Sequence, residues 1–293
     1  MLAAATWTQA QRAPAPRAEP LRVGFLRGAP DGAPTLAELE ALRRRIESDA
    51  TLGAALADAG FSGAGLFPAD GAEDLLRRLD AGEFDLAFVP ARILARQRPG
   101  YRVALQARRD SDIFPPRGGL VLRGGAVIAR EQRPVAEALA EGPVAVVATE
   151  SLAGHIAPAL LLRREHGIDL RRLDLVWFDS SEEVVKAVVS GLASAGVCES
   201  GALPAVLGAE WRAQGFVAVL AESEPVPTDP VVLRASLAPE VSPLGRLLRA
   251  AVVDHAREDG FGGVQYQEAA DDAYARLPAL LEEFAAPRED AAP

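Results

Sequence analysis

Patterns typical of buried strands alternate with helical patterns along this chain, and that alternation strongly restricts the folds open to it. Apolar runs over residues 21–26, 63–67 and 84–89 predict three strands in the first hundred residues. Helical patterns lie between them, over 72–79 and over 35–46, where Thr35 and Glu38 form a capping box. Such alternation at short spacing predicts a parallel, doubly wound α/β sheet. Ligands bind these sheets at the carboxyl ends of the strands, which here are the loops after Leu26 and Val89.

The same alternation restarts after residue 140. The β-branched run 144–147 predicts a buried strand, a small polar turn follows it, and a helical pattern begins after Gly154. Further strands are predicted at 103–107, 120–122, 126–129, 173–178, 195–198 and 216–220, and further helices at 134–140, 180–189, 203–207, 244–253 and 271–284. A strand that feeds through a small turn into a helix presents backbone N–H groups and the positive end of the helix dipole to an anion. The hydroxyl of Ser151 adds a donor, so this turn is a candidate ligand contact.

Composition excludes several classes of function. A net charge of −10 argues against nucleic acid as a general partner. The sequence contains no apolar run near the roughly 18 residues of a membrane span. Residues 1–19 are rich in Ala and Pro, and we expect a disordered leader or signal remnant there. Cys198 is the single cysteine, which excludes an internal disulfide and favours a buried small residue over a nucleophile.

Four segments carry a family resemblance. GEFDLAFVP (82–90) is similar to a G-x-x-D-hydrophobic-A-F-hydrophobic-x-P strand, and SLAGHIAP (151–158) to an S-T-S-G-x-x-x-P helix start. Residues 178–197 are similar to an F-x-G-S-H…G-x-A-D-A-G segment, and PVPTDPVVLR (225–234) to a proline-rich return to the first lobe. In this order they resemble the phosphate/phosphite/phosphonate-binding proteins of ABC importers, which are type 2 periplasmic solute-binding proteins.

The resemblance covers about residues 20–284 and implies a fold of two doubly wound α/β lobes joined by a two-segment hinge. Lobe 1 is expected at 20–128 and 226–293, lobe 2 at 129–225, and the hinge segments near 120–129 and 222–233. Five positions depart from the family pattern. The S-T-S triplet is Ser151-Leu152-Ala153, Glu182 stands at the ligand-facing histidine, Ser194 at the aspartate of A-D-A-G, and Ile93 near the tyrosine expected after Pro90.

These departures bear on the ligand. Two hydroxyls and a histidine are lost and a carboxylate is gained, and an unpaired carboxylate beside a dianion costs several kcal/mol. A zwitterionic or less charged solute therefore suits the sequence better than a dianionic phosphonate. The candidate ligand-binding residues are Thr149, Glu150, Ser151, Gly154, His155, Glu182, Arg27, Arg92, Phe114 and Arg117. Several have simpler interpretations, since Ser151 suits a plain N-cap, Glu150 suits a helix dipole, and Arg27 and Arg92 suit the surface.

The resemblance implies a non-enzymatic, monomeric periplasmic protein that captures a small anionic or zwitterionic solute between its lobes and delivers it to an ABC permease. No catalytic or metal-binding motif such as HExxH, GxSxG or a Walker A loop occurs, and no cofactor is expected. Two alternatives stay open. One is a periplasmic sensing or accessory protein without a permease. The other is a cofactor-biosynthesis enzyme on the same fold, for which Glu150 or Glu182 with His155 is the acid/base pair available.

Overall fold

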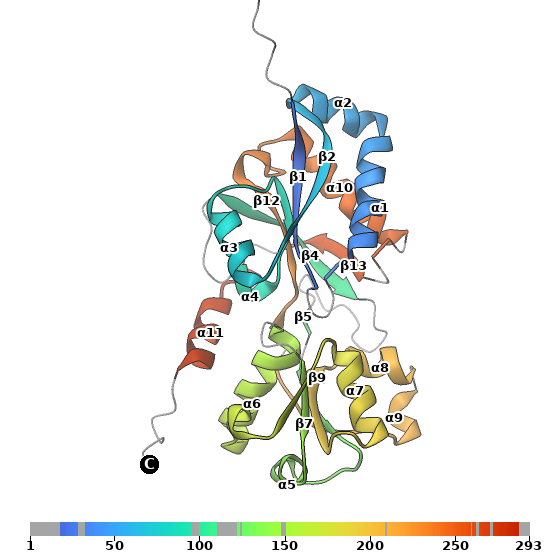
Figure 1. Ribbon diagram of the computed structural model, residues 1–293, viewed down its shortest axis with the longest axis vertical. Coiled ribbons are helices and arrows are strands. Elements are labelled where there is room, and N and C mark those ends of the chain that lie inside the picture. Colours follow the sequence, from blue (N-terminus) through green and yellow to red (C-terminus); the bar gives the residue numbers. More distant parts are fainter. Residues whose placement is uncertain are drawn as a thin grey trace, which may run out of the picture.

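Two α/β units stand one above the other, each built on its own mixed sheet (Figure 1). The computed structural model describes residues 18–28, 33–94, 100–109, 122–123, 125–147, 151–208, 210–224, 226–258, 260–261, 264–269 and 272–286. The predicted α/β fold class is confirmed. The parallel pairing predicted for the first three strands is present, and each sheet also contains antiparallel strands.

The upper unit contains a six-stranded sheet of order β13-β4-β12-β3-β1-β2. Its strands are β1 (Glu19–Leu26), β2 (Phe61–Ala69), β3 (Leu86–Phe88), β4 (Tyr101–Arg109), β12 (Pro230–Arg234) and β13 (Val264–Glu268). β1 pairs parallel with β2 and β3, as the alternation predicts. β12 runs antiparallel to β3 and β4, because it enters this sheet from the other unit and not through a βαβ crossover.

Helices cover both faces of this sheet. They are α1 (Leu36–Ser48), α2 (Ala50–Asp58), α3 (Ala72–Asp80), α4 (Ala91–Leu94) and α10 (Pro243–Arg257). The capping box at the start of α1 is confirmed, since Thr35 accepts from the Glu38 amide and the Glu38 side chain bonds back. Leu39, Leu42 and Ile46 of α1 are buried. Leu36, which the periodicity also placed in that apolar stripe, is 57% exposed at the first helical residue.

The lower unit contains a five-stranded sheet of order β10-β6-β9-β7-β8. Its strands are β6 (Gly125–Ala129), β7 (Val144–Val147), β8 (Leu175–Phe178), β9 (Ala195–Glu199) and β10 (Ala218–Glu222). β7 pairs parallel with β8 and β9, while β6 runs antiparallel to β9 and β10. The last predicted strand is displaced, because Phe216 is 56% exposed and the strand begins at Ala218.

Helices α5 (Val135–Ala140) and α6 (Ala157–His166) lie on one side of the lower sheet, and α7 (Ser181–Ser190), α8 (Ala202–Leu207) and α9 (Trp211–Gln214) on the other. A π-helical turn, η1 (Leu152–Ile156), precedes α6, and in it the Ala157 amide donates to the Leu152 carbonyl. Pro158 accounts for the wider turn, because it has no N–H to donate to the Gly154 carbonyl and its ring crowds that carbonyl.

The chain crosses between the two units at three places. Two crossings form a short antiparallel ladder, in which β5 (Leu122–Arg123) pairs with β11 (Val226–Pro227). The third runs from β13 to α11 (Leu277–Ala285), a shorter helix than the predicted 271–284, which packs against α6. The lobe boundaries expected from the sequence stay a prediction. The sequence assigns residues 226–293 to lobe 1, whereas α11 in that segment contacts the lower unit, so this boundary is the one to test. None of the helices in the described parts of the chain has the length and apolar character that a membrane span requires.

Candidate ligand-binding site

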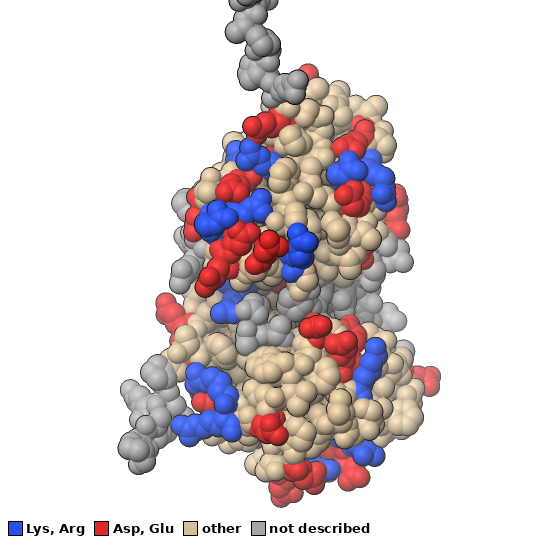
Figure 2. All heavy atoms as spheres, viewed as in Figure 1, with Lys and Arg blue, Asp and Glu red and all other residues tan. Residues whose placement is uncertain are grey.

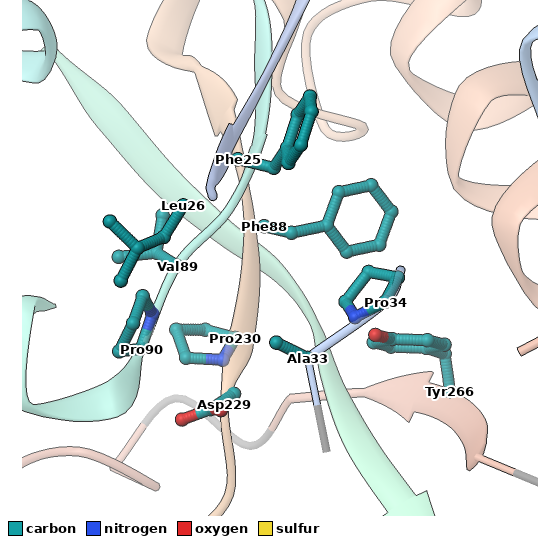
Figure 3. A pocket seen from close by; sticks show the side chains of 10 residues that line it. All are labelled: Phe25, Leu26, Ala33, Pro34, Phe88, Val89, Pro90, Asp229, Pro230 and Tyr266. Atoms are coloured by element: carbon teal, nitrogen blue, oxygen red, sulfur yellow. The ribbon is translucent and has the colours of Figure 1, made fainter. Parts of the chain in front are cut away.

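The carboxyl ends of β1 and β3 meet at a small pocket in the upper unit (Figure 3). It lies at the loops after Leu26 and Val89, where the strand–helix alternation predicts a ligand crevice. Its lining residues are Phe25, Leu26, Ala33, Pro34, Phe88, Val89, Pro90, Asp229, Pro230 and Tyr266. The pocket itself measures about 10 Å³, which is room for about one water molecule. The described side chains of this unit therefore form one wall of the candidate site and do not enclose a solute.

Most of this wall is apolar, and its polar groups are held in place. The rings of Phe88 and Tyr266 meet edge to face, with centroids 5.9 Å apart. Asp229 supplies the carboxylate of the wall, and its Oδ1 accepts from the Ala91 amide at 2.7 Å. Its backbone carbonyl accepts from the Ala107 amide at 2.9 Å. Asp229 is thus fixed between α4 and β4, with a carboxylate at the mouth of the pocket (Figure 3).

Hydrogen bonds tie the segment before Asp229 to its surroundings. The Thr228 hydroxyl donates to the Ala107 carbonyl at 2.5 Å, and the Tyr274 hydroxyl donates to the Thr228 carbonyl at 2.8 Å. Burial raises the pKa of Tyr274 far above its usual range, and the negative charge of Asp229 raises it further. Tyr274 therefore stays a neutral hydrogen-bond donor at every ordinary pH.

The lower unit presents a second cluster, at the carboxyl ends of β7 and β9. The Gly154 amide donates to the Ser151 Oγ at 3.0 Å, and the Glu199 amide donates to the Ser181 Oγ at 3.0 Å. The two serines converge on the glycine, because a Cβ on Gly154 would lie 2.8 Å from the Ser151 Oγ and 3.2 Å from the Ser181 Oγ. Ser151 therefore acts as an N-cap, and the amide of Gly154 is already hydrogen-bonded within the turn.

Three buried polar residues of this cluster escaped the sequence analysis. Ser181, Glu199 and Ser200 are 1%, 4% and 8% exposed. A signal was available for two of them, since Glu199 and Ser200 directly follow the predicted strand 195–198 and so stand at a carboxyl end. Asp229 and Tyr266 were also missed, because Asp229 directly precedes β12 and Tyr266 lies on β13, two antiparallel strands of the upper sheet whose pairing the alternation does not reveal.

The candidate ligand-binding residues predicted from the sequence lie in different parts of the structure. The structure brings Ser151 and Gly154 together, and Glu182 lies half-buried in the first turn of α7. Figure 2 shows acidic side chains gathered at that end of α7, facing the waist between the units. Arg27 pairs with Asp70 at 3.0 Å on the surface, the two side chains being 67% and 77% exposed. Arg92 is half-buried on α4, next to Pro90 of the pocket.

His155 is 3% exposed and lies in an aromatic stack. Its ring stacks on Trp177 of β8 with centroids 5.4 Å apart, and meets the edge of Phe284 of α11 at 5.9 Å. These contacts account for its burial. Thr149, Glu150, Phe114 and Arg117 lie outside the described residues. The ligand role of all ten residues stays a prediction.

Other kinds of site receive no support from the described residues. Within them no cluster of three or more His, Cys, Asp or Glu side chains could hold a metal ion. Cys198 is buried in the lower sheet, as expected for a small apolar residue. A wider pocket of about 430 Å³ lies between α6, residues 223–224, β11 and α11. We place the candidate site at the strand ends because buried polar groups of both units gather there.

Comparison with known proteins identifies the family and the fold. A family profile described as "ABC transporter, phosphonate, periplasmic substrate-binding protein" matches residues 54–274, well over half of the chain. No curated protein sequence matches the chain.

Similar solved structures share the fold. A methylphosphonate complex of PhnD1 from Prochlorococcus marinus has 13% identity and a TM-score of 0.63, and the alignment covers 90% of this chain and 98% of that one. A binding protein component of an ABC phosphonate transporter from Pseudomonas aeruginosa has 14% identity and a TM-score of 0.60, covering 91% and 86%. A Xanthomonas citri protein bound to ATP has 15% identity and a TM-score of 0.64, covering 90% and 97%.

Proposed function

The chain belongs to the family of phosphonate periplasmic substrate-binding proteins of ABC transporters, and from that premise we propose that it captures one small solute between its two α/β units. The captured solute is delivered to an ABC permease from the periplasm. The family resemblance found in the sequence is confirmed, and the family is one of binding proteins. The observation that carries the proposal is that strand-end polar groups of each unit, Asp229 above and Ser151, Ser181 and Glu199 below, stand on either side of the β5–β11 crossing.

Capture in this proposal depends on rotation of the units about the paired crossing segments. A two-stranded ladder is short enough to bend, while each sheet with its helices moves as a body. Closure is favoured by the solute only to the extent that the closed arrangement binds it more tightly than the open one. The solute must therefore contact groups of both units at once.

The charges at the strand ends favour a solute with a cationic group beside any anionic one. Asp229 and the buried Glu199 are carboxylates, and Glu182 stands in the first turn of α7. Arg92, a basic residue of α4, stands two residues after Pro90 of the pocket in the sequence. Each carboxylate adds negative charge, which opposes the binding of a dianion. The proposed ligand class is accordingly a zwitterion or a weakly charged anion.

A thermal-shift and calorimetric panel tests this proposal. The probes are inorganic phosphate, an alkylphosphonate, an aminoalkylphosphonate of the same chain length, an alkylsulfonate and neutral amino acids. A solute present at 100 times its Kd stabilises a protein by about 2.7 kcal/mol, so the shift is readily measured. We expect the aminoalkyl compound to bind more tightly than its alkyl counterpart. A preference for the alkyl compound contradicts the charge argument, and no response to any probe contradicts solute capture.

Two matched serine variants locate the site. Ser181→Ala removes the hydroxyl that accepts from the Glu199 amide, and we expect it to weaken solute binding. Ser48→Ala removes an exposed hydroxyl at the end of α1, so it serves as the control. Equal affinities for the two variants would remove Ser181 from the site.

Delivery to a permease is tested separately, because deletion of the gene should abolish high-affinity uptake of the identified solute. Unchanged uptake supports the sensing alternative.

A further inference from the structure

The C-terminal segment adds a third connection between the two units, beyond the two hinge strands. The segment comprises residues 272–285, and we name it the strap. It leaves β13 in the upper sheet and ends as α11 beside α6 of the lower unit (Figure 1). A connection of this kind opposes separation of the units if both of its ends are anchored.

The far end of the strap is held by two consecutive arginines of α6. The Arg163 guanidinium donates to the carbonyls of Glu283 and Phe284, at 2.9 and 3.3 Å, where the last turn of α11 leaves carbonyls without helical partners. Arg164 pairs with both carboxylate oxygens of Glu283, and its Nε–Oε1 distance is 2.6 Å. Such two-pronged pairs fix orientation as well as position.

Apolar contacts reinforce this end. The Phe284 ring meets His155, which stacks in turn on Trp177 of the edge strand β8. Leu277, at the start of α11, is 1% exposed in a cluster that contains Leu152 of the lower unit and Ala91 of the upper unit. The strap therefore contributes to an apolar contact that includes residues of both units.

The near end of the strap is anchored to the upper unit. The Tyr274 hydroxyl donates to the carbonyl of Thr228, the residue between β11 and β12. The Thr228 hydroxyl donates in turn to the Ala107 carbonyl on β4. The strap also borders the pocket of about 430 Å³ that α6, residues 223–224 and β11 line, and its own lining residues run from Asp272 to Leu280. This open space beside the strap leaves room for the hinge to move.

We propose that the strap limits how far the two units open in the ligand-free protein. This inference rests on the hinge motion of the proposed function and assigns to residues 272–285 the control of its range. Release of α11 from α6 widens the open ensemble and lowers the fraction of molecules near the closed arrangement. Apparent affinity for the solute then falls in proportion to that fraction.

Distances between spin labels test the proposal without any solute. Arg44→Cys on α1 and Lys186→Cys on α7 place labels on exposed positions of the two units, while the native Cys198 is buried and stays unlabelled. Two strap variants are compared in this background. One is Arg163→Gln with Arg164→Gln, and the other ends the chain at Arg276. We expect both to broaden the interlabel distances and shift them to longer values.

Arg43→Gln is the matched control, because Arg43 pairs with Glu40 and Glu47, which both lie on α1 and not in the strap. Its distances should equal those of the parent. Hydrogen exchange over residues 277–285 reports whether the double arginine variant releases α11. If residues 277–285 stay protected from exchange in the double arginine variant, the two arginines do not anchor α11. If α11 is released but the distances between the labels do not change, the strap does not limit the opening of the units. If the shortened chain does not fold, the double variant decides. A parent protein whose distances do not respond to a bound solute counts against the proposed function instead.

Discussion

Gly154→Ala probes the point where the two serines of the lower unit converge. A Cβ built on Gly154 lies 2.5 Å from the Val147 Cγ1, 2.8 Å from the Ser151 Oγ and 3.2 Å from the Ser181 Oγ. Favourable contacts between heavy atoms of this kind lie near 3.5–4.0 Å. At least two of the three neighbours must therefore move. Val147 is fully buried in β7 and cannot move without disturbing the core of the lower unit.

Three effects combine in the expected change of stability. Overpacking of a dense core costs about 1–3 kcal/mol. Displacement of Ser151 removes an N-cap hydrogen bond of about 1 kcal/mol. The gain in helix propensity from Gly to Ala returns about 1 kcal/mol. The free energy of unfolding should therefore fall by about 1–3 kcal/mol.

Urea unfolding measures this change, and the chain supplies a matched control. Gly53 lies inside α2, and a Cβ there meets nothing within 4 Å. Gly53→Ala should raise the free energy of unfolding by about 0.5–1 kcal/mol, through helix propensity alone. The two variants carry the same substitution and should differ in sign. If Gly154→Ala matches the parent protein while Gly53→Ala is stabilised, the close approach at Gly154 is wrong, and with it the convergence of the two serines.

Three further changes test the fold and its response to pH, each by urea unfolding. Thr35→Ala removes the capping box of α1 and should cost about 1 kcal/mol; an unchanged midpoint would show that the cap contributes nothing. Asp85→Asn removes the charge of a carboxylate that is 4% exposed, accepts from the Arg22 amide at 2.9 Å and pairs with Arg234 at 3.2 Å. The free energy of unfolding should fall by about 2 kcal/mol, and a change below about 0.5 kcal/mol contradicts this account. Burial lowers the pKa of His255 below its ordinary value of about 6.5, so the unfolded chain binds the proton first. The His255 contribution to stability is therefore complete above about pH 7 and falls as the pH drops through 6.5 toward the folded pKa. His255→Gln should weaken this dependence of the free energy of unfolding on pH. Equal pH dependence in the parent and the variant would contradict the assignment to His255.

Much of the fold follows from local pattern, and its main departures come from long-range pairing. Hydrophobic period and capping residues locate β1, α1 and α7, since these signals lie within a few residues of one another. The antiparallel entry of β12 does not follow, because its partners β3 and β4 are more than a hundred residues away in the sequence. The packing of α11 on α6 is equally non-local. Its apolar face has the same pattern whichever unit it contacts.

The residues of the candidate site also divide into those that local sequence pattern predicts and those that depend on long-range pairing. The rule that ligands bind at the carboxyl ends of parallel strands leads to the loops after Leu26 and Val89, and to the turn that contains Ser151. The same rule, applied after the strand 195–198, would have indicated Glu199. The rule does not lead to Asp229, which directly precedes β12, or to Tyr266 on β13, because only the tertiary structure reveals the neighbours of these strands. His155 lies in the same turn and is buried against Trp177, a contact that the sequence does not reveal.

The two interpretations of Ser151, as a helix cap and as a ligand contact, are compatible with each other. Its Oγ accepts from the Gly154 amide, and a hydroxyl that accepts one hydrogen bond still has a proton to donate. The cap fixes the position of the oxygen, and the remaining proton is then available at a defined place at the end of β7. A loss of stability in a Ser151 variant therefore says nothing about ligand contact, because the cap alone accounts for it. Only solute affinity, measured on the folded fraction, separates the two roles, and the same holds for every serine that caps a helix facing the waist between the units.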